Sequence, residues 1–208
     1  MLNTIACIAA AVAELTFGTP RAAVDLRLYT YASMDQAGIE EARHVAEGLL
    51  SAAGIQATWR LCGGPGDECQ GAPITASTVF VHVLPRRNNK NPSISGDAIP
   101  ASSGRRIAWV YVPQIAEMVD DFRRIGPRRN LIQLTTVTIG HLVGLTIAHE
   151  VGHTLGLGHS RSGLMRAQLG IEEVVAARNL RLAFQPKERE RMLVTLRSSE
   201  GVLAAGPR

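Results

Sequence analysis

The residues between Ala148 and His159 have the types and the spacing of a metal site. If this segment is helical, His149 and His153 are four positions apart and project from the same face. Two imidazoles at that spacing can bind one small cation such as zinc, whose bonds to nitrogen are about 2.0–2.1 Å long. Glu150 follows the first histidine directly, so its carboxylate can reach a water molecule beside the metal without itself being a ligand.

A third ligand follows where the helix has to end. Glycine readily takes the left-handed conformation that ends a helix and reverses the chain, and Gly156 is placed for that role. His159 then arrives three residues later and completes the pattern H-E-x-x-H-x-x-G-x-x-H. Three histidine ligands leave a fourth tetrahedral position open, which is typical of catalytic zinc sites. We therefore predict one zinc ion held by His149, His153 and His159.

The pattern resembles the signature of the metzincin metallopeptidases, in which the third histidine is followed by a Met-turn. Ser162–Met165 is similar to that turn, and the resemblance implies that Met165 is the apolar floor beneath the metal. Ser160 is similar to the matrixin branch, although the link from His159 to the methionine is shorter than in matrixins. The resemblance is specific from His149 to Met165 and loose elsewhere.

The resemblance implies an endopeptidase in which Glu150 takes a proton from a zinc-activated water and later delivers it to the leaving amine. It also implies a twisted sheet with two long helices in an upper part that extends to about residue 156. Residues 157–208 would form a smaller helical lower part. The substrate would be an extended polypeptide paired with an edge strand, a role that we assign to Ser93–Ile99. An unstructured surface loop is the alternative for that segment, because it contains Gly and Pro.

Simpler interpretations of the motif remain open. A bare H-E-x-x-H occurs by chance on helices, and Met165 on its own would be an ordinary core residue. A zinc-binding domain without turnover, kept for binding a partner, would contain the same three histidines. A zinc hydrolase that acts on a non-peptide amide would also contain these three histidines.

The composition is that of a globular protein, and we expect one catalytic domain over residues 14–208, acting as a monomer. Hydrophobic residues make up 46% of the 208 positions, and the net charge is +4. Aromatic residues make up only 4%, and no nucleic-acid-binding module is recognisable, so we expect no nucleic-acid partner. The basic excess is mostly arginine and includes four dispersed pairs: Arg86-Arg87, Arg105-Arg106, Arg123-Arg124 and Arg128-Arg129.

The first residues, Met1–Ala13, resemble the apolar core of a signal peptide and end in a small-x-small pattern. A buried first helix is the alternative. The run is too short to span a bilayer, so we expect a secreted or otherwise extracytoplasmic protein without a membrane span.

In such a protein Cys62 and Cys69 would form a local disulfide across their glycine-rich loop. Two alternatives exist for this cysteine pair. A second metal site would have no histidine nearby to complete it, and in a cytosolic protein the two cysteines would be free thiols.

Strands and helices alternate along the chain, which indicates an α/β fold with a mostly parallel sheet and helical cover. Alternating or continuous apolar runs predict strands at Val24–Tyr31, Ile55–Leu61, Thr78–Leu84 and Ile107–Val112.

Four helices are expected between and after these strands. Ser33 and Gln36 form a capping box for the first, which Gly54 ends, and Pro113 opens a second that Gly126-Pro127 ends. The third is the buried helix that carries the motif. It begins after Asn130, and the β-branched residues Thr135–Ile139 do not define its first residue. The last begins at Pro186, with Met192, Leu193 and Leu196 on one side as packing residues.

The other histidines are not expected to bind the metal. His141 precedes His149 by eight residues, which is about 12 Å along a helix axis. His82 lies in a strand among valines, and His44 lies on the first helix, where we expect it to be exposed.

Overall fold

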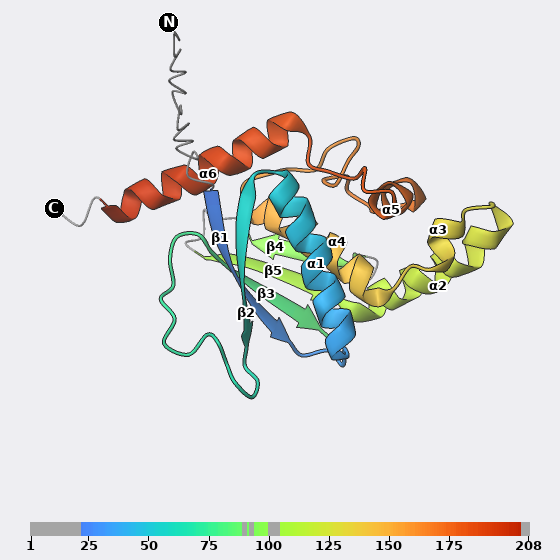
Figure 1. Ribbon diagram of the computed structural model, residues 1–208, viewed down its shortest axis with the longest axis horizontal. Helices are drawn as coiled ribbons and strands as arrows, with labels where there is room; N and C mark the ends of the chain where they lie inside the picture. Colours follow the sequence, from blue (N-terminus) through green and yellow to red (C-terminus); the bar gives the residue numbers. More distant parts are fainter. Residues whose placement is uncertain (1–21, 89–90, 92–93, 100–104, 205–208) are drawn as a thin grey trace, which may run out of the picture.

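The computed structural model describes residues 22–88, 91, 94–99 and 105–204, so the expected signal segment Met1–Ala13 lies outside the described residues. Its centre is a five-stranded sheet with the strand order β2-β1-β3-β5-β4 (Figure 1). Neighbouring strands are parallel except at the β4 edge, where β4 is antiparallel to β5. The strands are β1 (Ala22–Thr30), β2 (Ile55–Cys62), β3 (Thr78–Leu84), β4 (Gly96–Ile99) and β5 (Arg106–Tyr111).

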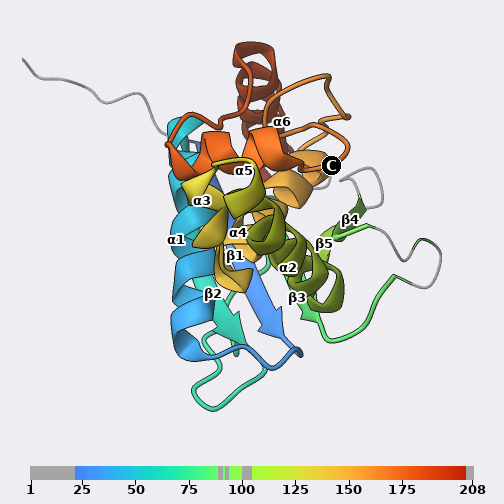
Figure 2. The same ribbon diagram turned by 90° about the vertical axis from the view of Figure 1, so that its right-hand side faces the viewer.

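Helices α1 and α4 lie together on one face of this sheet (Figures 1 and 2). The strand side chains beneath them are almost entirely apolar and buried, as at Val24, Leu26 and Val81. The helices are α1 (Gln36–Ala52), α2 (Val112–Arg128), α3 (Ile132–Thr135), α4 (Ile139–Thr154), α5 (Ile171–Arg178) and α6 (Pro186–Ala204). The mixed α/β fold with a mostly parallel sheet, predicted from the sequence, is therefore confirmed.

The expected strands are all present, with small shifts at their ends. The strand expected at Thr78–Leu84 has those bounds, whereas the strands expected from Val24 and Ile107 each begin earlier. The edge strand begins at Gly96, and Ser93, where its start was expected, lies outside the described residues.

The start of α1 differs from the capping box expected at Ser33 and Gln36. The N-cap is Asp35, whose side chain accepts a hydrogen bond from the backbone N–H of Gly38 at 2.8 Å. A carboxylate at this position satisfies one of the free N–H groups of the first turn and also interacts favourably with the helix dipole. The expected end is confirmed, because Gly54 has φ +82 directly after the helix.

Helix α2 does not end at Gly126-Pro127 as expected but continues to Arg128. Proline lacks one N–H, and the turn is held by other bonds, including that from the Leu131 N–H to the Gly126 carbonyl at 2.9 Å. A β carbon at Gly126 would lie 3.0 Å from the Leu131 carbonyl oxygen. The glycine therefore permits close packing of α2 against the segment that leads into α3, and it does not act as a helix stop.

Helix α4 lies against α1 at two glycines. A β carbon at Gly140 would lie 2.6 Å from the Gly38 carbonyl oxygen, and one at Gly144 would lie 2.5 Å from that of Ala42. Real side chains do not approach backbone atoms so closely, so only glycine lets the two helices come this near to each other. Because α4 carries the histidine motif, this contact fixes where the motif lies above the sheet.

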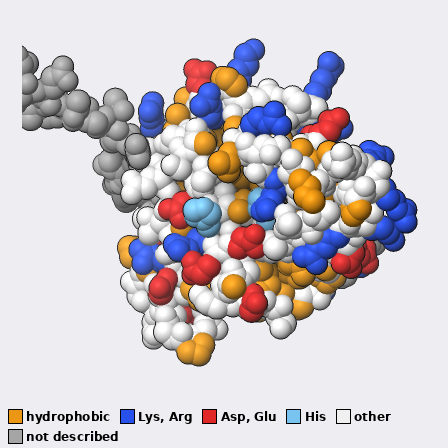
Figure 3. All heavy atoms as spheres, turned by 45° about the vertical axis from the view of Figure 1, so that its right-hand side comes forward, with side chains coloured by type: hydrophobic (Ala, Val, Ile, Leu, Met, Phe, Trp, Pro, Cys, Tyr) orange, Lys and Arg blue, Asp and Glu red, His pale blue; other side chains and the backbone are white. Residues whose placement is uncertain are grey.

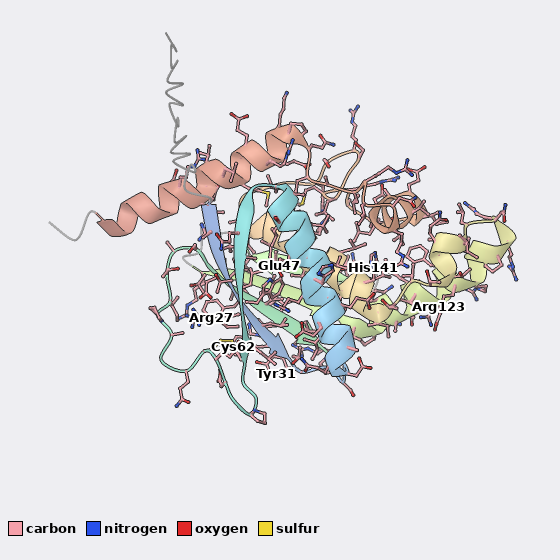
Figure 4. All side chains as sticks on the ribbon, in the orientation of Figure 1. Arg27, Tyr31, Glu47, Cys62, Arg123 and His141 are labelled. Atoms are coloured by element: carbon pink, nitrogen blue, oxygen red, sulfur yellow. A yellow bond between two sulfur atoms is a disulfide. The ribbon has the colours of Figure 1, made fainter. Side chains whose placement is uncertain are left out.

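The opposite face of the sheet is partly covered by the loop between β2 and β3. The Arg27 guanidinium is buried there and donates from Nη2 to the Ala72 carbonyl oxygen at 3.0 Å (Figure 4). Cys62 and Cys69 form a disulfide at the start of the same loop, as expected. Both interactions hold the loop on the side of the sheet away from the motif helix.

Helix α6 begins at Pro186, as expected, and buries Met192 and Leu196, while Leu193 is partly buried against the core. Within the described part of the chain, none of the helices is long and apolar enough to cross a membrane.

Replacing Gly144 with alanine is expected to destabilise the fold by about 1–3 kcal/mol, because the new methyl group overpacks the contact between α1 and α4. Gly48→Ala is the matched control. Gly48 is exposed on α1, and an added β carbon there meets no atom within 4 Å, so alanine should stabilise the helix by roughly 0.4–1 kcal/mol. Urea unfolding of both variants measures the difference, and equal effects at the two glycines would contradict this account.

Stability should also depend on the protonation of His141, which is buried on α4 (Figure 4). Burial lowers the pKa of His141, nearby Arg178 lowers it further, and Glu41 partly opposes them. The unfolded chain binds a proton at this side chain more readily than the folded chain, so stability is lost as the pH falls below 6.5. We expect His141→Leu to flatten that loss, by at most about 1.4 kcal/mol per pH unit, in urea unfolding between pH 7.5 and 5.5. An unchanged slope would contradict the role of this histidine.

Candidate metal centre

Helix α4 brings two of the three motif histidines side by side and then turns the chain back toward them. The helix starts at the N-cap Thr138, whose hydroxyl accepts the His141 N–H, and it ends at Thr154. Gly156 follows with φ +86, as the sequence predicted. The N–H of Gly156 bonds to the His153 carbonyl and that of Leu157 bonds to the Gly152 carbonyl, which together form a Schellman motif.

Two backbone carbonyls set the orientation of the helix histidines. Nδ1 of His149 lies 2.7 Å from the Leu164 carbonyl oxygen, and Nδ1 of His153 lies 2.9 Å from that of Leu157. A carbonyl oxygen only accepts hydrogen bonds, so each Nδ1 carries the proton and donates it. In the neutral rings each Nε2 is therefore a bare acceptor and is available as a metal ligand.

These acceptors point at one another. Nε2 of His153 lies 3.0 Å from Nε2 of His149 and 3.1 Å from Nε2 of His159. The lone pairs of His149 and His153 face each other without a proton to share, which is unfavourable unless a cation lies between them. Tetrahedral zinc with bonds of about 2.0–2.1 Å requires ligand nitrogens about 3.3 Å apart, close to the spacing observed here. This donor set therefore fits a zinc ion.

The two helix histidines, His149 and His153, are in the neutral state that a metal requires at neutral pH. Burial lowers the pKa of His149 to about 4, and the hydrogen bond to Leu164 opposes this only in part. Burial lowers the pKa of His153 as well. His159 is exposed and completes the group at the floor of a cleft of about 1470 Å³. A metal entering from this cleft has few protons to displace.

Glu150 lines the same cleft and is only 5% exposed. Burial, together with the smaller effect of the nearby charge of Asp97, raises its pKa to about 8. The side chain lies against Gly96 of β4, where a β carbon would clash with the Glu150 carboxylate and lie 2.7 Å from Cγ2 of Thr146. A glycine at this position of β4 lets the edge strand pass directly beside the carboxylate.

The expected turn at Ser162–Met165 is present beneath the helix. The Ser160 N–H donates to the Met165 carbonyl oxygen at 2.8 Å, and Gly163 has φ +83. Met165 is fully buried, and a β carbon at Gly152 would lie 2.6 Å from its sulfur. The methionine therefore packs against bare helix backbone next to His153. Leu164, which orients His149, belongs to the same turn.

The structure keeps the other histidines away from this centre. His82 stacks with Tyr29 and Tyr31, with ring centroids 5.1 and 5.9 Å apart respectively, and His44 is exposed on α1. His141 is buried earlier on α4. In the described part of the chain, a second cluster with metal-ligand types consists of the disulfide-bonded Cys62 and Cys69 together with Asp67.

Sequence reasoning missed several residues of the cleft. Gly96 and Asp97 enter it from β4, and a glycine inside an expected strand was the available signal for a close backbone approach. Arg161 and Arg166 follow the third histidine closely along the chain. Arg191 comes from α6, which the sequence indicated only as a packing helix, and no local pattern marks it.

Comparisons with known proteins agree with this architecture. No protein-family model and no curated protein sequence matches the chain. Among solved structures, it is similar to archaemetzincin from Methanopyrus kandleri, with 16% identity, a TM-score of 0.52, and coverage of 86% of this chain and 99% of that chain. It also matches metalloproteinase-II from Bacteroides fragilis, with 12% identity and a TM-score of 0.46, over 84% of this chain and 53% of that one. The first similarity shows that the chain has an archaemetzincin-like fold.

The purified protein is expected to bind one equivalent of Zn²⁺ or Co²⁺, because the described residues contain one group of three converging imidazole nitrogens. His153→Ala should weaken binding by at least about 100-fold, because it removes the ligand that lies near both other nitrogens. His82→Ala is the control and should bind normally. Calorimetry and the visible spectrum of the Co²⁺ form measure both variants, and equal affinity in the two would contradict this site.

Proposed function

We propose that this protein is a zinc-dependent peptidase. The observation that carries the proposal is the convergence of three imidazole nitrogens at the floor of a large cleft, with the Nδ1 atoms of His149 and His153 already bonded to backbone. The fold supports it as well, because it is similar to that of the archaemetzincin from Methanopyrus kandleri. The buried Glu150 beside this group supplies a second chemical element that a peptidase requires.

His149, His153 and His159 would hold the ion in this proposal. Zinc, when bound, supplies a Lewis acid that polarises a carbonyl group and lowers the pKa of water. The protein's own contribution is the orientation of the ligands. The Leu157 and Leu164 carbonyls keep the rings of His153 and His149 in one tautomer, so the ligand atoms need not rearrange before chemistry.

Glu150 is the proposed general base and acid. Its carboxyl group is buried, and in the metal-free chain its raised pKa keeps it protonated near neutral pH. A nearby cation favours the ionised form, which then accepts the proton of the attacking water. Glu150 afterwards donates that proton to the leaving nitrogen of the cleaved peptide bond.

An extended peptide is proposed to bind along β4. The Tyr111 N–H donates to the Ser95 carbonyl at 2.8 Å, so by the antiparallel alternation the backbone groups of Gly96 and Ala98 point away from β5. These groups lie at the open edge of the sheet, next to the cleft. Backbone pairing at this edge would place a peptide bond beside Glu150.

We extend the proposal to location and assembly. The Cys62–Cys69 disulfide supports an extracytoplasmic protein, because such bonds persist in oxidising compartments. Removal of Met1–Ala13 as a signal peptide and a monomeric state belong to the same proposal.

Replacing Glu150 with glutamine is expected to leave one bound zinc per chain and to lower peptide cleavage by about 10²–10⁴-fold, because the amide cannot take up the proton. A quenched-fluorescence peptide library and casein measure cleavage, and metal analysis measures zinc. Chelation should abolish the activity of the unchanged chain, and added zinc should restore it.

Glu190→Gln on α6 is the matched control, since that carboxylate is exposed and lies outside the cleft. Full activity of Glu150→Gln would show that the proposed mechanism is wrong. Bound zinc without cleavage of any peptide by the unchanged chain would favour a silent binding module or a hydrolase of non-peptide amides.

A further inference from the structure

Acidic and basic side chains from different parts of the chain line the cleft. Asp97 enters it from β4. Arg161, Arg166 and Arg191 line the cleft from the chain after the third histidine. Figure 3 shows basic side chains along the upper and right-hand margins of the molecule, where α6, α5 and α2 lie.

The three arginines differ in what they bind inside the protein. Arg166 donates from Nη1 to Glu173 at 2.9 Å and to Glu172 at 3.2 Å, so internal carboxylates already neutralise its charge. Arg161 and Arg191 are exposed, and neither guanidinium has an ion pair or hydrogen bond with any residue that the structure describes. Their charges are therefore available to a molecule in the cleft.

The positions of these two arginines place them on the same part of the site. Arg161 follows the third histidine by two residues. Arg191 reaches over the turn after the motif helix, where its Nε lies 4.0 Å from the position that a β carbon would take at Gly156. Both thus border the segment Gly156–Arg161, which carries His159 and lines the cleft.

We propose that the cleft selects peptides that present a carboxylate to Arg161 and Arg191, an inference that rests on the proposed peptidase function. A guanidinium recognises a planar carboxylate through two parallel hydrogen bonds. The carboxylate of Asp97 repels the same group, so the charge pattern also sets the direction in which an acidic peptide lies. The carboxylate comes either from an Asp or Glu side chain or from the C-terminus of the substrate.

Binding to the zinc-loaded Glu150→Gln variant tests this selection without cleavage. Fluorescence anisotropy is measured for a labelled neutral peptide, for a series in which one glutamate is moved along it, and for the same series with glutamine. Each peptide is made with a free C-terminal carboxylate and with a C-terminal amide. We expect at least one acidic peptide to bind about tenfold more tightly than its glutamine or amide counterpart.

A preference that follows the moving glutamate identifies a side-chain carboxylate, and a preference lost only on amidation identifies the C-terminus. Adding Arg161→Gln and Arg191→Gln to the Glu150→Gln variant should remove the preference. Arg197→Gln is the matched control, because that arginine is exposed on the same helix as Arg191 but does not line the cleft. The preference should also weaken in 1 M salt, where the screening length falls to about 3 Å.

Equal binding of acidic and neutral peptides, or a preference that survives both arginine substitutions, would overturn the proposal. Either result leaves the peptidase function intact if the unchanged chain still cleaves the library. Failure of the peptidase function gives a different result, namely no cleavage of any peptide by the zinc-loaded chain. Because the carboxylate preference is measured as binding, it is observed or refuted in both cases.

Discussion

The arrangement of this site depends on two hydrogen bonds from imidazole Nδ1 groups to backbone carbonyls. They join His149 to Leu164 and His153 to Leu157, so the rings of one helix are oriented by the chain that follows it. Each bond fixes the proton on Nδ1 and leaves Nε2 as a bare acceptor. Without them each ring would be free to turn about its side-chain bonds and to exchange tautomers. With them in place, Nε2 of His153 lies 3.0 Å from Nε2 of His149 and 3.1 Å from Nε2 of His159.

Those carbonyls are in place only because the chain turns back tightly after α4. Gly156 permits the reversal in its left-handed conformation, and Gly152 gives the Met165 side chain room against the helix backbone. Two more glycines, Gly140 and Gly144, bring α4 against α1. The glycines of the motif helix therefore serve packing on two sides, although glycine is a poor helix former. Tertiary contacts outweigh its low helix propensity here.

The cleft combines elements that are far apart in the chain, and this explains its uneven charge. An edge strand contributes Asp97, the motif helix contributes Glu150, and the C-terminal helix contributes Arg191. Gly96 allows the strand to touch the helix, and the same contact buries Glu150 and shifts its pKa. Burial, charge and access to a peptide therefore have a common origin in the approach of β4 to α4.

Spacing along the chain was enough to predict that His149, His153 and His159 converge, that Gly156 ends the helix and that this helix is buried, because all of these depend on local geometry. Apolar patterning likewise predicted the strands and the mostly parallel sheet. The tertiary structure alone decided the N-cap at Asp35 and the continuation of α2 past Pro127, because neighbouring carboxylates and close packing compete with local signals there. It also decided that Arg191 borders the cleft, since the place of a helix at the far end of the chain follows from long-range packing, which no local pattern encodes.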